Sequence, residues 1–357
     1  MLGMIIPNPW LTNLRQDRTR SYIVSSSSIT EIVHFRFPVF PKVTVDTEIV
    51  ILQKKIAERA QVKATFVESL NDSQAIEDSK KQIILHDQDD WKRLNGEAIN
   101  IFLNPAEKHL ASKCLHGSKP LSEHCVINVG IKPYQTGKGT PPQTQAIVKT
   151  RPFDSNETSP SYRRYLMGKD IGRYRIQPLT DRYLKYGPWL AEPRPAANFN
   201  APEKILMRQT GDRLVGCLDT NQLLCLNNMH VLVPANSHTD LLYLLGIINS
   251  RLLNWYYRTL NPEVGEALAE VKKANVARLP IRDADLTDST NRTRHDWIAR
   301  SVGFMLDAQS HLTAAKTERD ITYYEGKCAA LDREIDVLVY DLYGLTAEEI
   351  ALVESAG

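Results

Sequence analysis

Short apolar blocks and a helical stretch alternate near the beginning of the chain. Residues 3–10, GMIIPNPW, are apolar up to a proline-limited turn, which predicts a buried strand and then a turn. Residues 11–26 have a helical pattern, while 29–35 (ITEIVHF) and 43–54 (VTVDTEIVILQK) are rich in β-branched residues and predict two further strands. This order of strand, helix, strand and strand predicts the trailing half of an α/β domain.

A second block of strands is expected in the middle of the chain. Residues 203–234 alternate apolar and polar positions as antiparallel strands do, and turn residues interrupt them at 210–212 and 219–222. Residues 240–260 are mostly apolar and predict one buried helix, in which Gly246 and Ser250 are small enough for close packing.

The C-terminal region predicts a helical hairpin. Apolar residues recur there at alternating steps of three and four, which forms one stripe on a helix that packs against a preceding helix. Gly344 ends the striped helix, and Thr346 with Glu349 forms a capping box that begins a last short helix. The stripe comprises Ile321, Tyr324, Cys328, Leu331, Ile335, Leu338 and Leu342, and the partner helix contributes Ile298, Val302, Met305 and Leu312.

Composition indicates an ordinary globular protein. The chain has 357 residues, of which 42% are hydrophobic and 24% charged, which suits two domains with a substantial core. No window is apolar for the roughly 18 to 20 residues that a membrane span needs, and the start lacks the features of a signal peptide. Five scattered cysteines argue against a disulfide framework. We therefore expect a cytoplasmic protein without membrane contact.

Positive charge is concentrated in one segment. Residues 161–213 hold eleven Lys or Arg against five Asp or Glu, a local surplus of +6 in a chain whose net charge is +2. Cations next to flat rings are typical of nucleic-acid surfaces, although a charge run is more often an ordinary solvated face. The interleaved aromatic residues are Tyr162, Tyr165, Tyr174, Tyr183, Tyr186, Trp189 and Phe199.

The amino-acid sequence of this segment resembles that of a known protein family. LMGKDIGRY (166–174), YGPWLAEPR (186–194) and EKILMRQTGDRL (203–214) resemble the TaqI-like C-terminal specificity domain, the target-recognition part of adenine-N6 DNA methyltransferases and type IIG restriction-modification enzymes. The resemblance continues in order through 241–257, 271–281 and 332–354. It implies that the chain binds double-stranded DNA and recognises a sequence in it.

The N-terminal segments resemble the later motifs of the same methyltransferases. These segments are GMIIPNPWL, ITEIVHF and VFPKVTVDTEIVILQK. In the family, a glycine-rich turn binds S-adenosylmethionine and an Asn/Asp-Pro-Pro-Tyr/Phe motif grips the target amino group. Neither occurs here, since GKGT (137–140) and GTPPQ (139–143) depart from both. The resemblance therefore implies a C-terminal piece of a larger enzyme, or one partner of a separate catalytic half. In either case this chain has no catalytic residue and does not bind S-adenosylmethionine alone.

One methyltransferase residue is retained by position. Phe40, in VFPKV, matches the aromatic residue that stacks on the flipped adenine in the family. The alternative is that Phe40 fills the core beside a strand. Asn8, in NPW, matches the family's later strand end better than its catalytic motif.

The resemblance also suggests residues that contact DNA. Residues 126–143 resemble the opening of the specificity domain, a strand and then a Gly/Pro/Thr-rich loop suited to phosphate contact. An Arg side chain can donate two hydrogen bonds to O6 and N7 of guanine, whereas Lys acts more as a point charge for phosphate. The base-reading candidates are Arg173, Arg175, Arg194 and Arg208. The phosphate candidates are Lys132, Lys138, Arg163, Arg164, Lys169, Lys185 and Lys204. For each of these, a plain surface role is the alternative.

Two other chemistries are weakly represented. The irregular spacing of His109, Cys114, His116, His124 and Cys125 does not match a structural zinc site, so we expect no metal. A nuclease needs carboxylates and a lysine around Mg²⁺. The nearest such cluster is Asp87, Asp89 and Asp90 with Lys92, and no paired-strand context supports it.

Together these patterns predict an α+β protein in four parts. Residues 1–55 form the C-terminal portion of a methyltransferase domain and 56–115 a connecting region. Residues 116–285 form the target-recognition domain, a mixed sheet with helices, and 286–357 a helical hairpin packed on it. The leading hypothesis is sequence-specific recognition of double-stranded DNA. The alternative is a folded but inert interaction subunit, or a remnant, that binds a protein partner.

Overall fold

Two compact units make up the chain, Met1–His109 and Leu110–Gly357. The computed structural model describes residues 1–37, 39–40, 47–54, 60–68, 81–93, 99–177, 180–260, 269–283 and 287–355. Each unit has hydrophobic clusters of its own. Among the helices within these ranges, none is both long enough and apolar enough to cross a membrane.

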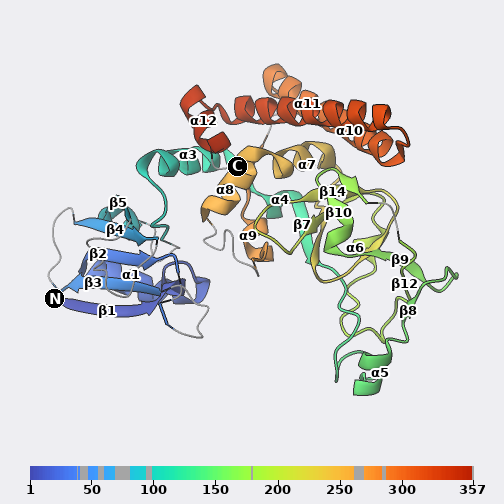
Figure 1. Ribbon diagram of the computed structural model, residues 1–357, viewed down its shortest axis with the longest axis horizontal. Helices are drawn as coiled ribbons and strands as arrows, with labels where there is room; N and C mark the ends of the chain where they lie inside the picture. The colour runs from blue at the N-terminus through green and yellow to red at the C-terminus, as the bar shows by residue number, and fades with distance from the viewer. Residues whose placement is uncertain are drawn as a thin grey trace. The chain divides into compact units, whose positions relative to one another are not determined.

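A five-stranded sheet in the order β1-β3-β2-β4-β5 forms the centre of the first unit (Figure 1). Strands β2 and β4 are parallel and the other neighbours are antiparallel. The strands are β1 Leu2–Pro7, β2 Ser28–Phe35, β3 Thr47–Gln53, β4 Gln61–Val67 and β5 Lys81–Asp87. The helical segments are η1 Asn8–Trp10, η2 Leu14–Gln16, α1 Asp17–Ser26 and α2 Gln88–Arg93.

The strands and the helix expected in residues 2–37 and 47–53 are present, and residues 43–46 lie outside the described ranges. The expectation that the first strand is buried is wrong. Leu2, Met4 and Ile5 on β1 are 52%, 46% and 46% exposed. The reason is that β1 lies at the edge of the sheet, where β3 is its one strand neighbour among the described residues.

The second unit is built on a four-stranded antiparallel sheet in the order β14-β13-β16-β7. Side chains on its strands alternate between two cores. On β13, Ile205 and Met207 join the core shared with the helices, whereas Leu206 joins the core on the other face. The strands are β7 Cys125–Val129, β13 Lys204–Arg208, β14 Gly216–Asp219 and β16 Met229–Pro234.

Helices cover one face of this sheet, and α10 and α11 run alongside each other (Figure 1). The helices on this face are α4 Leu121–His124, α7 Leu241–Asn249, α8 Arg251–Leu260, α9 Lys273–Ala277, α10 Ser289–Ala314, α11 Glu318–Tyr343 and α12 Ala347–Ser355. A further helix, α3 Pro105–Leu115, spans the boundary between the units, and β6 Ser118–Pro120 pairs with β17 Pro280–Arg282.

The predicted helical hairpin is confirmed. Ile335, Leu331 and Val302 are buried between the helices, and only the first residue of the stripe, Ile321, is exposed. Gly344 adopts φ +67° and ends α11. The capping box is formed as expected, because the Thr346 N–H donates to Glu349 and the Glu349 N–H donates to Thr346.

The single buried helix expected at 240–260 is in fact two helices. Ser250 has extended backbone angles and separates α7 from α8. Its hydroxyl donates to the Ile247 carbonyl and accepts from the Leu253 N–H. Gly246 provides the expected close packing, since an added Cβ would lie 2.8 Å from Ile298 and 2.9 Å from Val302.

Smaller elements cover the other face of the sheet. A second sheet has the order β15-β9-β12-β8, and β10 and β11 form a separate hairpin. These strands are β8 Asp154–Ser155, β9 Arg163–Leu166, β10 Ile171–Gly172, β11 Arg175–Ile176, β12 Tyr183–Leu184 and β15 Leu224–Cys225. The short helices are α5 Gln145–Thr150, η4 Gly168–Asp170 and α6 Ala197–Asn200. The expected mixture of helices and sheets is thus confirmed, while half a methyltransferase domain at the N-terminus stays a prediction.

Candidate nucleic-acid interface

Strand β13 carries two of the candidate DNA contacts on one face. Lys204, Leu206 and Arg208 alternate with side chains that face the helices, so all three point toward the small sheet. Their environments differ sharply along the strand.

Lys204 is fully buried. Its Nζ lies 2.5 Å from an Asp219 carboxylate oxygen, and both side chains are 0% exposed. The two residues are direct cross-strand partners on β13 and β14. The Lys204 ammonium also donates to the Phe199 carbonyl at 3.1 Å. The expected phosphate contact is therefore wrong for Lys204, because its charge is neutralised inside the protein.

Arg208 holds the η4 turn against the sheet. Its guanidinium donates to the Gly168 carbonyl at 2.9 Å and to the Ile171 carbonyl at 2.6 Å. Asn228 accepts from the Gly168 N–H at 3.2 Å. A Cβ on Gly168 would lie 3.2 Å from the Asn228 carbonyl oxygen, so this turn is close to the sheet. Arg208 thus fixes the backbone on both sides of Lys169.

The same turn is closed from within by Asp170. Its carboxylate accepts from the Met167 N–H at 2.7 Å and pairs with Arg182. Lys169, the middle residue of η4, is exposed. The described part of the chain offers the Lys169 ammonium no ion pair or hydrogen bond, so a rigid backbone presents an unpaired cation to solvent.

The β10–β11 hairpin follows directly after η4. Arg173 donates to both oxygens of Asp332 at 2.9 and 2.7 Å and to the Asn249 carbonyl at 2.7 Å. These contacts tie the hairpin to α11 and α7. Arg175 lies against Gly172, where an added Cβ would be 3.2 Å from its Nε. In contrast to Arg173, Arg175 has no ion pair or side-chain hydrogen bond within the described ranges.

Five residues form a row in which three aromatic rings lie between two cations. Arg151 lies over the Tyr134 ring at 4.5 Å, and Tyr134 stacks on Phe153 with centroids 5.6 Å apart. Phe153 contacts Trp189 at 6.2 Å, and the Lys185 Nζ lies 5.2 Å above Trp189. We call these residues the cation–aromatic stack. Such contacts order a cation while leaving its charge at the surface.

Lys185 and Arg151 at the two ends of this stack differ in their pairing. Arg151 donates to Asp154 at 2.7 Å. The Lys185 ammonium has no acidic partner in the part of the chain that is described. Sequence reasoning missed Tyr134, Arg151 and Phe153, because pairing between β8 and β12 brings them to Lys185, whose N–H donates to the Phe153 carbonyl 32 positions away.

The loop 133–143 carries Lys138 and is held by one buried amide. The Gln143 side chain donates to the Pro133 and Trp189 carbonyls at 2.8 and 2.9 Å and accepts from the Gln135 N–H. Lys138 is exposed. Lys132 exchanges two backbone hydrogen bonds with Glu192, and its side chain is half-buried. For neither lysine does the described structure place an acidic partner.

The remaining arginines have local partners at the surface. Arg163 donates to Asn200 and to the Gln222 carbonyl. Arg164 donates to Asp181 and to the Tyr183 hydroxyl. Arg194 pairs with Glu192. Arg163 and Arg164 lie on β9, and Lys185 directly follows β12. The structure thus brings all three residues to one small sheet, in which β8, β12 and β9 lie side by side (Figure 1).

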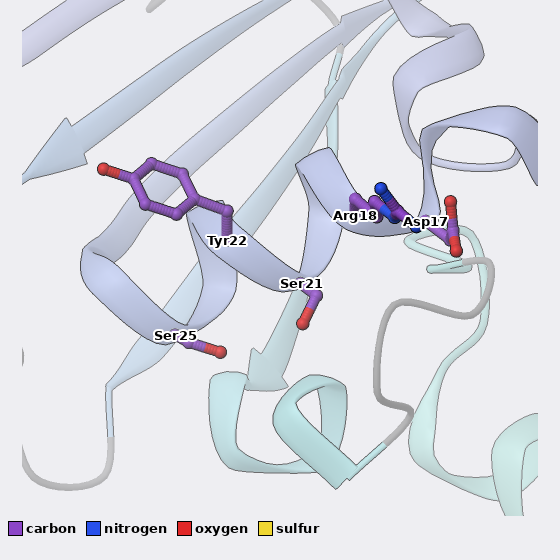
Figure 2. Close-up of a pocket in the computed structure, with 5 residues that line it drawn as sticks. All are labelled: Asp17, Arg18, Ser21, Tyr22 and Ser25. Atoms are coloured by element: carbon purple, nitrogen blue, oxygen red, sulfur yellow. The ribbon is translucent and has the colours of Figure 1, made fainter.

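The first unit contains two further candidates from the sequence, Phe40 and the NPW segment. Phe40 is 46% exposed, and residues 41–46 that follow it are outside the described ranges. Trp10 of the NPW segment is buried and donates to Glu48 at 2.9 Å. Figure 2 shows a shallow depression on α1, whose lining side chains spread along one helix instead of converging. Its lining residues are Asp17, Arg18, Ser21, Tyr22 and Ser25.

The weaker alternatives have structural roles. The Lys92 ammonium pairs with Asp89 at 2.6 Å, and Asp87 accepts from the Asp89 N–H. Burial raises the pKa of the Cys114 and Cys125 thiols to about 12, which disfavours the thiolate form. Within the described residues, three or more metal-binding side chains never gather at one place.

Three strands of the four-stranded sheet, the η4 turn and the β10–β11 hairpin lie in a segment that matches a known domain. Residues 163–281 match the TaqI-like C-terminal specificity domain. The resemblance expected from the sequence is therefore confirmed for this segment. Within it lie Lys169, Arg175 and Lys185, while Lys132 and Lys138 precede it.

Comparisons with whole proteins extend over nearly the entire chain. A provisionally assigned type II restriction enzyme and methyltransferase of Methanocaldococcus jannaschii is 20% identical over 353 residues, which cover 96% of this chain and 27% of that protein. The structure of MmeI, a type IIL restriction-modification enzyme in complex with DNA, superposes with a TM-score of 0.52 at 12% identity. That superposition covers 98% of this chain and 48% of MmeI. The type IIG restriction endonuclease BpuSI superposes with a TM-score of 0.33 at 11% identity, over 96% of this chain and 47% of BpuSI. The chain thus spans about a quarter of the archaeal relative and about half of MmeI.

Proposed function

We propose that this chain recognises a specific sequence in double-stranded DNA on behalf of a restriction-modification system. The match of residues 163–281 to a specificity domain supports the proposal, as do the restriction-modification relatives. The observation that carries it is the η4 turn. Arg208, Asp170 and Asn228 fix its backbone, and Lys169 extends from it without a described partner.

The contacts divide the candidate residues by role. Arg173 and Arg208 already use their guanidinium groups to hold the fold, so we assign them positioning roles. The Arg175 guanidinium has no side-chain partner in the described structure, and we propose that it donates two hydrogen bonds to O6 and N7 of a guanine. The lysines with unpaired charge in the described structure are assigned to phosphates, namely Lys132, Lys138, Lys169 and Lys185. Arg163, Arg164 and Arg194 stay candidates that exchange their surface partners for DNA.

We assign the chemistry to a catalytic half that these residues do not contain, either in a larger enzyme of which they are a piece or on a separate partner. The sequence contains neither the glycine-rich turn nor the Asn-Pro-Pro-Tyr/Phe motif, so the residues present do not fit S-adenosylmethionine. Methyl transfer to adenine N6 therefore belongs to that catalytic half in this proposal. Phe40 contributes an exposed ring that stacks on the flipped base, which has lost its neighbours in the duplex.

Selection from random duplexes tests the proposal. The full chain should retain duplexes with a short enriched motif at near-physiological salt. Arg175→Ala should relax one position of that motif at a cost of about 1–3 kcal/mol. Lys169→Ala should weaken binding to all sequences and reduce the salt slope by about 0.9.

Lys316→Ala serves as the matched control, because Lys316 is an exposed lysine between α10 and α11, outside the proposed surface. It should leave both affinity and motif unchanged. Retention without a motif would mean generic phosphate binding. A wild-type chain that retains no duplex would contradict the proposal and favour the interaction-subunit alternative.

A further inference from the structure

Helices α10 and α11 carry large apolar side chains that the described structure leaves about half exposed or more. Trp297 and Phe304 on α10 are 49% and 54% exposed. Tyr323 and Val337 on α11 are both 62% exposed. Single exposed apolar residues are normal, whereas a contiguous group marks an interaction surface. The positions of these four side chains on the two helices decide which case applies.

Residue spacing places each pair on one stripe. Trp297 and Phe304 are seven residues apart, and Tyr323 and Val337 are separated by two such steps with Ala330 between them. A step of seven residues returns to nearly the same side of a helix. Each helix thus carries one apolar stripe that its own core contacts leave uncovered.

Three contacts fix the register between the two helices. Arg294 donates to Asp341 at 2.6 Å, Ser301 donates to Glu334 at 2.7 Å, and His311 stacks on Tyr324. From the first pair to the second, the position advances seven residues on α10 and falls back seven on α11. This antiparallel register sets Trp297 level with Leu338, one residue from Val337, and Phe304 level with Leu331, one residue from Ala330.

Helical geometry places both stripes on the same side of the hairpin. With about 100° per residue, Trp297 and Phe304 lie about 40–60° from Ser301, on the side away from Ile298. Ala330 and Val337 lie about 40–60° from Glu334, on the side away from Ile335. Ile298 and Ile335 both face Gly246 of α7. The stripes therefore meet along the outer groove between α10 and α11, and we call this surface the outer hairpin face.

The outer hairpin face is complementary to itself in shape. Its α10 side carries the large rings of Trp297 and Phe304. The middle of its α11 side carries Gly326 and Ala330, and an added Cβ on Gly326 would meet nothing within 4 Å. Under a twofold axis parallel to the helices, Phe304 of one copy therefore meets the small Ala330 of the other, and Trp297 meets Val337, as in knobs-into-holes packing.

Charges on the two edges of this face are complementary as well. The α10 edge is net acidic, because it carries Asp296 and Asp307, whose side chains are 59% and 58% exposed, and one exposed cation, Arg300, which lies over the Trp297 ring. The α11 edge carries the exposed Arg319 and Arg333. A twofold axis parallel to the helices sets α10 of one copy opposite α11 of the other, so that each acidic edge meets a basic edge.

We propose that two copies of this chain associate through the outer hairpin face, with α10 of each copy packed against α11 of the other. The association buries Trp297, Phe304 and Val337 and leaves the proposed DNA contacts on other elements free. The inference concerns assembly and does not depend on DNA recognition.

Light scattering after size exclusion tests the association across a roughly hundredfold range of protein concentration. Wild type should reach twice the mass of one chain, and Phe304→Glu should remain at the mass of one chain with an unchanged circular-dichroism spectrum. Val126→Glu is the matched control, since Val126 is also 54% exposed but lies on β7. It should associate like wild type.

Charge reversal tests the arrangement independently of the apolar contacts. Asp296→Lys with Asp307→Lys makes both edges basic, and Arg319→Glu with Arg333→Glu makes both acidic. Each variant alone should associate more weakly than wild type, and an equimolar mixture should recover the dimer. A wild type that stays monomeric throughout overturns the proposal, as does a dimer that Phe304→Glu leaves intact. A mixture that fails to recover the dimer overturns the arrangement of α10 against α11.

Discussion

Lys169 and Lys204 belong to the same basic segment and have opposite environments. Lys169 is exposed on a turn, whereas Lys204 lies inside the protein beside Asp219. Sequence reasoning assigned both to phosphates. The partner of Lys204 becomes visible only when β13 and β14 are paired, because that pairing sets Lys204 directly opposite Asp219. The same residue type is therefore a surface charge in one case and half of a buried ion pair in the other.

Replacing Lys204 alone should destabilise the protein strongly. Lys204→Met leaves the buried Asp219 carboxylate without its cation, which costs about 3–5 kcal/mol in comparable pairs. Two backbone N–H groups, of Asn221 and Leu223, still donate to Asp219 and reduce the loss. Urea unfolding measures the change. Lys169→Met, at the exposed turn, should stay within about 0.5 kcal/mol. Equal small effects of both substitutions would contradict the buried pair.

His86 should make the first unit sensitive to acid. Burial is the main cause that lowers its pKa to about 4, and the nearby Lys108 acts in the same direction. The folded state therefore binds fewer protons than the unfolded state below the ordinary value of 6.5. The stability contribution of the neutral ring is complete above about pH 6.5 and is lost as the pH falls through about 4, by up to about 3 kcal/mol.

Unfolding followed from pH 7 to pH 4 measures this loss. His86→Gln, which can still donate to the Ile101 carbonyl, should flatten the pH dependence in this range. His238→Gln, at an exposed position, should leave the curve as in wild type. A steep acid loss that survives in His86→Gln would assign the sensitivity to another group.

At the scale of elements, short turns and breaks position the proposed surface. The η4 turn has three residues, and its shape depends on Arg208 of β13 and on Asn228 in the turn before β16. The break between α7 and α8 depends likewise on a tertiary contact. The Arg251 N–H, just after Ser250, donates to Asp336 on α11 at 2.8 Å. An apolar run such as 240–260 predicts helix correctly but cannot locate a break that a distant carboxylate stabilises.

Loss of Arg208 should weaken DNA binding through Lys169. Arg208→Ala removes both hydrogen bonds to the η4 backbone, at a cost of about 1–3 kcal/mol in folding stability. It should also lower affinity for all DNA sequences, as Lys169→Ala does. The double variant should bind no more weakly than Lys169→Ala alone, because both changes act on one contact. Additive losses in binding titrations would instead mean that Arg208 contacts DNA itself.

On the scale of the whole molecule, the hydrophobic clusters divide cleanly between the units. The clusters around Phe66 and Phe35 contain residues of the first unit only, and those around Ile247 and Leu206 contain residues of the second only. A unit with its own core should fold without the other. The four-part division expected from sequence, with a separate connecting region, stays a prediction.

A chain that begins at residue 105 should therefore retain the proposed recognition function. It keeps α3 and both cores of the second unit complete. We expect cooperative thermal unfolding and selection of the same DNA motif as the full chain. The matched fragment 1–104 should retain no duplexes. If 105–357 folds but selects a different motif or none, residues of the first unit take part in recognition.

The sequence by itself determined the local features of this protein. Periodicity placed the strands at 29–35 and 203–234 and the C-terminal hairpin with its caps, because these depend on residues close together in the chain. The sequence motifs identified the specificity domain in the same way. Tertiary structure alone decided which cations are available, since the partners of Arg173 and Lys204 are 159 and 15 positions away. It also brought together the cation–aromatic stack and the outer hairpin face, because strand pairing and helix register are set by packing between distant segments.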